Sequence, residues 1–318
     1  MSSISCRGKS AIFSRRGSDW GSQPLAALFA RVARPLGAAD TPGDVGGRTQ
    51  GGRDRRDVLD VADSPVNEEF FGRPGVNKGE KSAFPQARLL AVAECGTHAI
   101  FAATIGAYRD AESTMVEHVL DALTPEMLVL ADRGFFSYAL WRNASDTGAD
   151  LLWRVSTGRN GPTPPTHVED LADGSWLAHL RAAKDRHGEP MLARVIDYTV
   201  DDGRDNPPVA YRLLTTLTDP DTAPAVELAA AYAQRWEIES VFDELKTHQR
   251  GSKVVLRSKS PDLVLQEIWG IPVLPLRDSL VDEPSRTPQR TRPGPTQLHR
   301  RVARRAPIRR PSGRFFPP

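Results

Sequence analysis

Two acids in predicted core elements have the residue types and positions that suit metal-dependent chemistry. Asp132 follows the apolar run Met127–Ala131, a typical short buried strand, and ligands of open α/β sheets gather at that end of a strand. Glu239 lies on a later predicted helix and could approach it. Clustered carboxylates repel one another, and Mg²⁺ relieves the repulsion through oxygen ligation. The alternative for Asp132 is a helix N-cap or a turn residue.

The stretch around Glu239 adds a phenol and two cations at regular intervals. Tyr232, Arg235, Glu239 and Lys246 are three, four and seven residues apart, which places them on one stripe of an α-helix. Apolar residues such as Leu228 lie mostly off that stripe and are expected to face a core. The alternative interpretation is a solvated amphipathic helix, with ion pairs such as Arg235 with Glu239 between neighbouring turns.

The spacing Tyr-x2-Arg-x3-Glu-x6-Lys resembles the signature of bacterial insertion-sequence transposases of the DDE superfamily, in the insertion-sequence-four branch. The segments Thr247–Gly251 and Val255–Pro261, and Leu130–Phe136 upstream, are similar to that branch as well. The resemblance covers roughly residues 57–270, with a weaker patch at 23–43. A four-point signature with these segments in the right order is a specific signal.

This resemblance implies a fold and an activity. The fold would be α/β: a ribonuclease-H-like mixed sheet with helices, interrupted by a mainly β insertion. The activity would be cleavage and strand transfer of DNA, with Asp132 and Glu239 as catalytic residues and metal ligands. Two Mg²⁺ (or Mn²⁺) ions about 4 Å apart would activate the attacking oxygen and stabilise the leaving oxygen. Tyr232, Arg235 and Lys246 would bind DNA phosphates.

The resemblance also implies partners and a location. The partners would be DNA, as transposon terminal repeats and target DNA, and a second copy of the chain that forms a homodimer across two transposon ends. We expect no membrane association, and a bacterial cytoplasmic location at the nucleoid.

The first acid of the superfamily is displaced in this chain. In this branch it stands in an apolar-Asp-Gly-Thr stretch just before a segment resembling Val58–Pro65, and counting back places it at Arg55. Asp57 would share a strand face with position 55 and is our candidate for the third catalytic residue, whereas Asp54 would point the other way. The surroundings also lack the apolar residues of a buried first strand.

Damage to the reading frame would explain this departure. Codons for Gly52–Asp57, read one nucleotide later, can spell Ala-Ala-Ile-Asp-Gly and begin Thr. Comparable alternatives exist for Phe13–Trp20 and Gly270–Leu280. We therefore hypothesise a transposase gene with small insertions and deletions. The alternative function is a non-catalytic remnant that only binds DNA or interferes with an intact transposase.

The elements that must position these residues alternate between strand-like and helix-like patterns, which favours an α/β sheet with crossovers. In chain order, the patterns predict strands at 89–93 and 99–105, a helix at 112–123, a strand at 127–131, a helix at 137–147 and a strand at 151–155. The β-rich runs Met191–Val200 and Val209–Leu217 follow, and the signature helix is predicted over Ala223–His248.

The chain thus divides into five predicted regions. These are a degraded N-terminal region 1–56 with a short helix at 23–36, the first part of the catalytic core 57–156, the mainly β insertion 157–222, the signature helix and a following helix 223–270, and a disordered Arg/Pro-rich tail 271–318. As an alternative, the tail is a basic DNA-binding segment with salt-sensitive affinity.

Composition sets looser bounds. The 318 residues are 39% hydrophobic and 26% charged with a formal net charge of +2, which fits a globular protein and does not by itself indicate a nucleic-acid partner. No apolar run is long enough to cross a membrane. Cys6 and Cys95 form no metal or disulfide framework, and the histidines lack metal-ligand spacing. Trp153, Trp176 and Trp236 are expected in the core, and Trp176 is the one to test for DNA contact.

Overall fold

One ten-stranded mixed sheet runs through the part of the chain that the computed structural model describes. That part comprises residues 21–35, 48–50, 58–75, 81–95, 97, 99–157, 165–182, 189–200, 209–233, 235 and 255–281. The strands are β1 (Arg48–Gln50), β2 (Val58–Asp60), β3 (Gln86–Ala93), β4 (Ile100–Ala107), β5 (Leu128–Ala131), β6 (Asp150–Val155), β7 (Thr166–Asp170), β8 (Trp176–Leu180), β9 (Met191–Val200) and β10 (Val209–Thr215).

The core of the sheet combines antiparallel and parallel pairs. Along the sheet the order is β2-β3-β1-β5-β6-β10-β9-β8-β7, and β4 pairs with β3 as well. β1 is antiparallel to β3 and parallel to β5, which in turn is parallel to β6. Val129, Leu130 and Ala131 are completely buried, as expected for a central strand with both faces covered. The predicted α/β class, a mixed sheet with helices, is confirmed.

The two apolar runs before Asp132 form the predicted antiparallel hairpin. β3 and β4 pair from Ala87 with Ala107 to Ala93 with Ile100, and the amide of Glu94 donates to the carbonyl of Ala99 at 2.9 Å to close the turn. Alternating residues of β3 face opposite sides of the sheet, so this hairpin contributes to two separate cores.

Short helices cover one face of the sheet. The predicted helix at 112–123 forms as α4 (Glu112–Glu117) followed by a 3₁₀ turn at Leu120–Ala122. α5 (Tyr138–Asp146) begins after Ser137, whose hydroxyl accepts a hydrogen bond from the amide of Leu140 at 3.1 Å. That contact is an N-cap, and it satisfies a free amide of the first turn.

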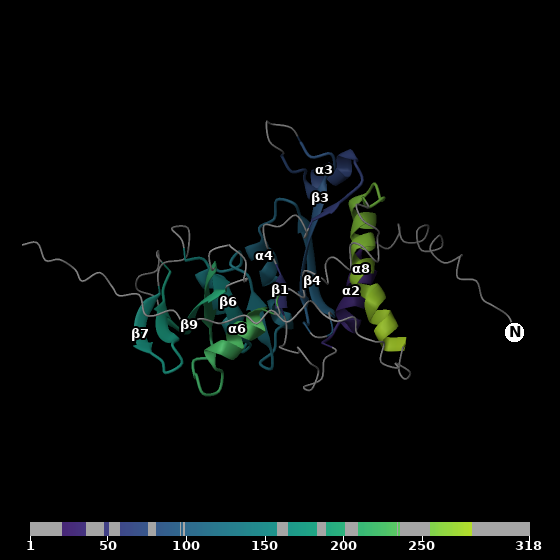
Figure 1. The fold of residues 1–318 in the computed structure, drawn as a ribbon. Coiled ribbons are helices and arrows are strands. Elements are labelled where there is room, and N and C mark those ends of the chain that lie inside the picture. Colours follow the sequence, from purple (N-terminus) through teal and green to yellow (C-terminus); the bar gives the residue numbers. More distant parts are fainter. Residues whose placement is uncertain are drawn as a thin grey trace, which may run out of the picture.

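The opposite face carries two groups of helices (Figure 1). α2 (Gln23–Val32) and α8 (Pro261–Val281) lie side by side next to β3 and β4, where the Phe29 and Trp269 rings are 5.3 Å apart. α6 (Ala225–Ala233) covers β5, β6, β9 and β10. The predicted boundary at residue 270 falls inside α8, because Ile271 continues the buried stripe of Val264 and Ile268. No helix within the ranges above could span a membrane.

The predicted β insertion continues the core sheet. β10 pairs antiparallel with β6, and β9, β8 and β7 follow it outwards as an antiparallel series, which Figure 1 shows at the end of the molecule opposite α2 and α8. Ala178, Val195 and Leu214 of the insertion are buried in the same cluster as Val129 and Trp153 of the core. The insertion and the core therefore share one hydrophobic interior.

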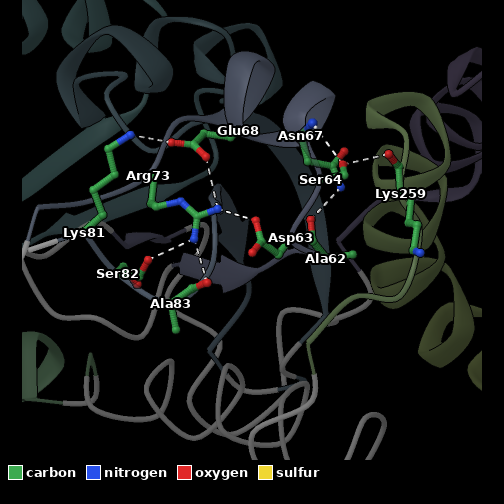
Figure 2. Close-up of polar contacts among 10 residues, drawn as sticks. All are labelled: Ala62, Asp63, Ser64, Asn67, Glu68, Arg73, Lys81, Ser82, Ala83 and Lys259. Atoms are coloured by element: carbon green, nitrogen blue, oxygen red, sulfur yellow. Dashed lines mark hydrogen bonds and ion pairs between the residues drawn. The ribbon is translucent and has the colours of Figure 1, made fainter.

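A polar brace joins β2 and α3 (Pro65–Phe71) to the segment before α8 (Figure 2). The buried Asn67 donates its two amide hydrogens to the carbonyls of Ala62 at 2.9 Å and Ser258 at 3.0 Å. The Ser64 hydroxyl donates to the carbonyl of Lys259 at 2.9 Å. The brace fixes residues 258–259, just beyond the signature stretch, to the N-terminal part of the core.

Candidate active site

Asp132 lies directly after β5, as the apolar run before it predicted. Its side chain is 25% exposed, so the carboxylate is open to solvent on one side. The amide of Phe135 donates to the Asp132 carbonyl at 3.1 Å, and the Phe135 ring is buried. Because Ser137 caps α5, Asp132 is not its N-cap, and the side chain remains available for chemistry.

The Tyr232 hydroxyl reaches Asp132 from α6. It donates to Asp132 Oδ1 at 3.3 Å and lies 3.4 Å from the carbonyl oxygen of Ala131. Tyr232 is only 3% exposed, and burial raises the pKa of its hydroxyl well above the ordinary value. The phenol therefore stays protonated and acts as a hydrogen-bond donor.

The expected separation of two faces on the signature helix does not hold at its start. Leu228 and Tyr232 are four residues apart, so they lie on the same side of α6, and both pack into the cluster with Leu130 and Leu152. The ring of Tyr232 thus belongs to the core, and only its hydroxyl reaches the polar site.

Arg154 is a site residue that the sequence analysis missed. β5 and β6 pair Ala131 with Trp153, so the next positions along the two strands are Asp132 and Arg154. Arg154 Nη1 lies 3.9 Å from Asp132 Oδ1. A cation within the otherwise apolar strand Leu151–Val155 was the available signal, since charged side chains are rarely placed on buried strands without a partner.

Aromatic rings hold Arg154 in place. Its guanidinium lies over the Tyr211 ring, 4.1 Å from the centroid, and Tyr211 stacks on Tyr198 at 5.3 Å. Such cation–π contacts stabilise by about 0.5–2 kcal/mol and restrict where the charge can move. The planar fork of Arg154 is therefore held beside the carboxylate.

Arg235 lies against the ring of Tyr232, just after the end of α6. Its amide donates to the Tyr232 carbonyl at 3.1 Å, and its guanidinium carbon is 5.6 Å from the Tyr232 ring centroid. Only 8% of the residue is exposed. Asp132, Tyr232, Arg154 and Arg235 thus gather in one cluster, which we call the Asp132 cluster.

The remaining predicted site residues lie outside the described ranges. They are Asp57, Glu239 and Lys246. The meeting of Asp132 with Glu239 therefore stays a prediction. Within the described ranges, no three His, Cys, Asp or Glu side chains come close enough to form a metal site. Asp132 alone supplies one accessible carboxylate, so a metal ion there requires further ligands from the other predicted acids.

The backbone of β1 identifies the position next to Asp132. β1 pairs Gln50 with Ala91 of β3 and, on its other edge, Arg48 with Leu130 of β5 in parallel. Two residues further along these parallel strands, position 50 neighbours Asp132. A side chain from the central strand that reaches the Asp132 cluster would therefore come from position 50 in this register.

β2 follows a different register on the same edge of β3. It pairs Val58 with Arg88, and continuing that register backwards would place position 55 opposite Ala91. Gln50 holds that place in the structure, so the two registers are offset by five residues. Position 55 is where the resemblance expects the missing acid, and the β2 register would bring that position beside Asp132.

Trp153 and Trp176 differ in their burial. Trp153 is buried, as predicted. Trp176 is half-buried: its indole N–H donates to Asp197 at 3.4 Å, and the ring stacks on His167 at 5.5 Å. Asp197 and Tyr198 are consecutive and so face opposite sides of the sheet, which places Trp176 away from the Asp132 cluster. A DNA contact by Trp176 stays a prediction, at a different surface.

Known proteins resemble this chain over most of its length. A family model described as transposase DDE domain matches residues 54–271. Transposase InsG for insertion sequence element IS4, from Escherichia coli (strain K12), is 27% identical over 215 residues, or 66% of this chain and 47% of that protein. A cryo-electron microscopy structure of the piggyBac transposase synaptic complex with hairpin DNA aligns with a TM-score of 0.44 at 9% identity, covering 85% of this chain and 52% of that one. The chain spans about half the length of both.

Proposed function

Since the chain belongs to the transposase DDE domain family, we propose that it is a metal-dependent DNA transposase that cleaves phosphodiester bonds at transposon ends and transfers the strands to target DNA. The observation that carries the proposal is the Asp132 cluster, in which a partly exposed carboxylate lies beside Arg154 and the Tyr232 hydroxyl, and Arg235 lies against the ring of that tyrosine. Cations around an acid at a sheet edge suit a polyanionic substrate whose reacting phosphate needs charge compensation.

In this proposal Asp132 and Glu239 hold the divalent metal ions, with Asp57 as the candidate third acid. Both contacts of Asp132 in the cluster use Oδ1, so neither engages Oδ2, the oxygen we assign to a metal. Two Mg²⁺ or Mn²⁺ ions would activate the attacking oxygen and stabilise the leaving oxygen. Tyr232 orients the Asp132 carboxylate through its hydroxyl.

Three cations bind the DNA backbone in this proposal. Arg154 and Arg235 present guanidinium forks, which match phosphate oxygens in pairs, and Lys246 adds a point charge. The DNA is the terminal repeat of the transposon and then the target. A homodimer bridges two transposon ends, and the reaction takes place in the bacterial cytoplasm.

A second candidate function is favoured by the residue at position 55. The chain has Arg55 where the family resemblance expects the first acid, and a cation there would repel a metal ion. The chain would then be a non-catalytic remnant that binds DNA or interferes with an intact transposase. Frame damage in the gene, the hypothesis drawn from the sequence, would account for it.

A nicking assay separates the two functions. The purified chain is incubated with DNA that carries the ends of its own element, with Mg²⁺, Mn²⁺ or EDTA. We expect cleavage only with metal, and its loss in Asp132→Ala and Glu239→Ala. The matched control is Asp121→Ala, which removes an exposed acid of the 3₁₀ turn. Equal cleavage by the wild type and both site variants would overturn the catalytic proposal.

Restoring the first acid is the complementary test. One variant carries Asp-Gly-Thr at positions 55–57, and the other is Gln50→Asp. The first follows the β2 register and the second follows the β1 register. If the wild type is inactive, a gain of metal-dependent nicking in either variant supports the remnant function for the present chain. If neither variant nicks DNA, the assignment of the Asp132 cluster as an active site is contradicted.

A further inference from the structure

Arg194, at the centre of β9, is a buried cation that the predicted active site does not use. Its side chain is completely buried. Nε donates to the Ser175 hydroxyl at 2.7 Å, and Nη2 forms an ion pair with Asp173. Nη1 is shared among three backbone carbonyls, of which Ala223 is the nearest at 2.7 Å. A buried guanidinium is tolerated only with this degree of hydrogen bonding.

The other two carbonyls belong to the loop between β10 and α6. Leu217 and Asp219 each accept from Arg194 Nη1 at 3.3 Å. With Ala223, these contacts fold the loop around one guanidinium group just before α6 begins. Arg194 therefore determines where the chain enters the helix.

Asp173 completes the arrangement from the turn between β7 and β8. Its Oδ2 accepts a hydrogen bond from the amide of Ala225, the first residue of α6, at 2.8 Å. Its Oδ1 accepts from the amide and the hydroxyl of Ser175. A carboxylate on a free amide of the first helical turn acts as an N-cap, here supplied from 52 residues away. Gly174, with a φ of +87°, allows the turn.

The start of α6 is linked to the Asp132 cluster along one helix. Tyr232 lies seven residues after Ala225, about 10 Å along the axis. Leu228 and Ala229 pack against the sheet between them. A shift of the helix by 1 Å away from Asp132 would move the Tyr232 hydroxyl out of hydrogen-bond range, because the distance is already 3.3 Å.

We propose that Arg194 and Asp173 are positioning residues for the candidate active site, which fix the start of α6 and so hold Tyr232 against Asp132. The inference rests on the proposed function for its catalytic consequence, whereas the positioning itself is a property of the fold. Through these two residues the β insertion acts on the signature stretch, to which its strands contribute no predicted catalytic residue.

Another arginine–aspartate pair of the insertion provides the matched control. Arg212 of β10 pairs with Asp197 of β9 through two hydrogen bonds of 2.7 and 2.8 Å. Both side chains are partly exposed, and they connect two neighbouring strands to each other. A conservative change at Arg212 therefore tests an ion pair of the same sheet whose two hydrogen bonds join β9 to β10.

The experiment compares Arg194→Lys, Asp173→Asn and Arg212→Lys in the full chain by hydrogen exchange. Lysine keeps the charge but cannot reach Asp173, Ser175 and the loop carbonyls together. We expect the amides of residues 223–233 to exchange about tenfold faster in the first two variants, because local opening there requires less free energy. The exchange rates of the β5 and β6 amides should remain unchanged. In Arg212→Lys, residues 223–233 should keep the wild-type rate.

Two exchange results would overturn the proposal. One is an equal increase in all strands, which would mean that Arg194 and Asp173 only stabilise the whole fold. The other is an increase confined to β7–β10, which would mean that they serve the insertion alone.

A cleavage-competent form of the chain, either the wild type or a restored variant, adds a kinetic test. With Arg194→Lys we expect the single-turnover cleavage rate to fall about tenfold or more, as misplacement of site groups does. The dissociation constant for terminal DNA should stay within about twofold, because no DNA-binding group is removed. A parallel loss of DNA affinity would contradict positioning. If no form cleaves DNA, the proposed function fails, and the exchange results still decide the positioning.

Discussion

At the scale of single residues, the Asp132 cluster depends on neighbouring positions of parallel strands. Asp132 and Arg154 follow paired residues of β5 and β6, and the hydroxyl of Tyr232 reaches Asp132 from α6. None of these residues is a sequence neighbour of the others. One oxygen of the acid thereby has a hydroxyl at 3.3 Å and a guanidinium nitrogen at 3.9 Å already in place, which would reduce the reorganisation that a reaction requires.

Arg154→Gln should weaken binding of DNA that carries the transposon ends. Removing one phosphate contact lowers the slope of log affinity against log salt by about one. Fluorescence anisotropy at several salt concentrations measures that slope. Arg109→Ala is the control, because Arg109 is exposed and donates to the carbonyl of Glu69 at 3.1 Å, far along the chain from the cluster. Equal slopes for both variants would show that Arg154 does not contact a DNA phosphate.

Tyr232→Phe should destabilise the fold by about 1 kcal/mol, the usual net value of one hydrogen bond. The ring stays in its core position, so the change reports on the hydroxyl and its bond to Asp132. Urea denaturation measures the difference. Tyr211→Phe serves for comparison, because the contacts of Tyr211 with Arg154 and Tyr198 use its ring. A loss as large in Tyr211→Phe would mean that the assay does not isolate hydroxyl contacts.

At the scale of elements, α6 is held at its start by distant residues and α8 is held by α2. The first arrangement is polar and depends on charge. The second is apolar, with Phe29 and Trp269 in contact. The two therefore respond to different perturbations.

Lowering the pH should weaken the contacts of Asp173 that hold the start of α6. Although burial opposes it, hydrogen bonds from Ser175 and Ala225 and the charge of Arg194 lower the pKa of Asp173 below its ordinary value. A lowered folded-state pKa contributes stability above the unfolded-state pKa, and that stability is lost as the pH falls through the folded-state value. The free energy of unfolding should thus fall more steeply below about pH 4 in the wild type than in Asp173→Asn. Parallel pH profiles would contradict this.

Phe29→Ala should cost about 3 kcal/mol, as expected when a buried phenylalanine leaves a cavity. Phe29 is 3% exposed, whereas its neighbour Leu28 is 43% exposed. Leu28→Ala should therefore change the stability by less than about 0.5 kcal/mol. Urea unfolding of the two variants makes the comparison. Similar losses would mean that α2 does not pack on α8 in solution.

The local sequence pattern predicted the helices and strands themselves, but it could not predict the contacts between them. The strands at 127–131, 151–155 and 191–200 and the helix at 137–147 follow from hydrophobic patterning. Arg154 was missed because its partner is set by the register between β5 and β6, which no local pattern encodes. For the same reason Tyr232 was assigned to a polar stripe, whereas the tertiary packing of α6 buries its ring.

At the scale of the whole molecule, core and insertion form one sheet. β10 of the insertion pairs with β6 of the core over four residues, and one hydrophobic cluster contains residues of both. An insertion joined in this way has no separate interior. Its stability is therefore shared with that of the core.

Unfolding should accordingly be a single transition for the core and the insertion. We expect the far-ultraviolet circular dichroism and the tryptophan fluorescence to change at the same urea concentration, the usual sign of two-state behaviour. The six tryptophans of the chain include Trp141 and Trp153 in the core and Trp176 in the insertion. Two separate midpoints would mean that the insertion melts on its own.

The five-residue offset between the β1 and β2 registers has an evolutionary consequence. A cell that carries this gene has two codons at which a new acid would approach Asp132. Codon 50 serves if the first strand stays as it is, and codon 55 serves if the strand slides along β3 to meet β2. Selection for movement of a marked element would enrich one of them, and the codon that accumulates acids would report the register adopted in living cells.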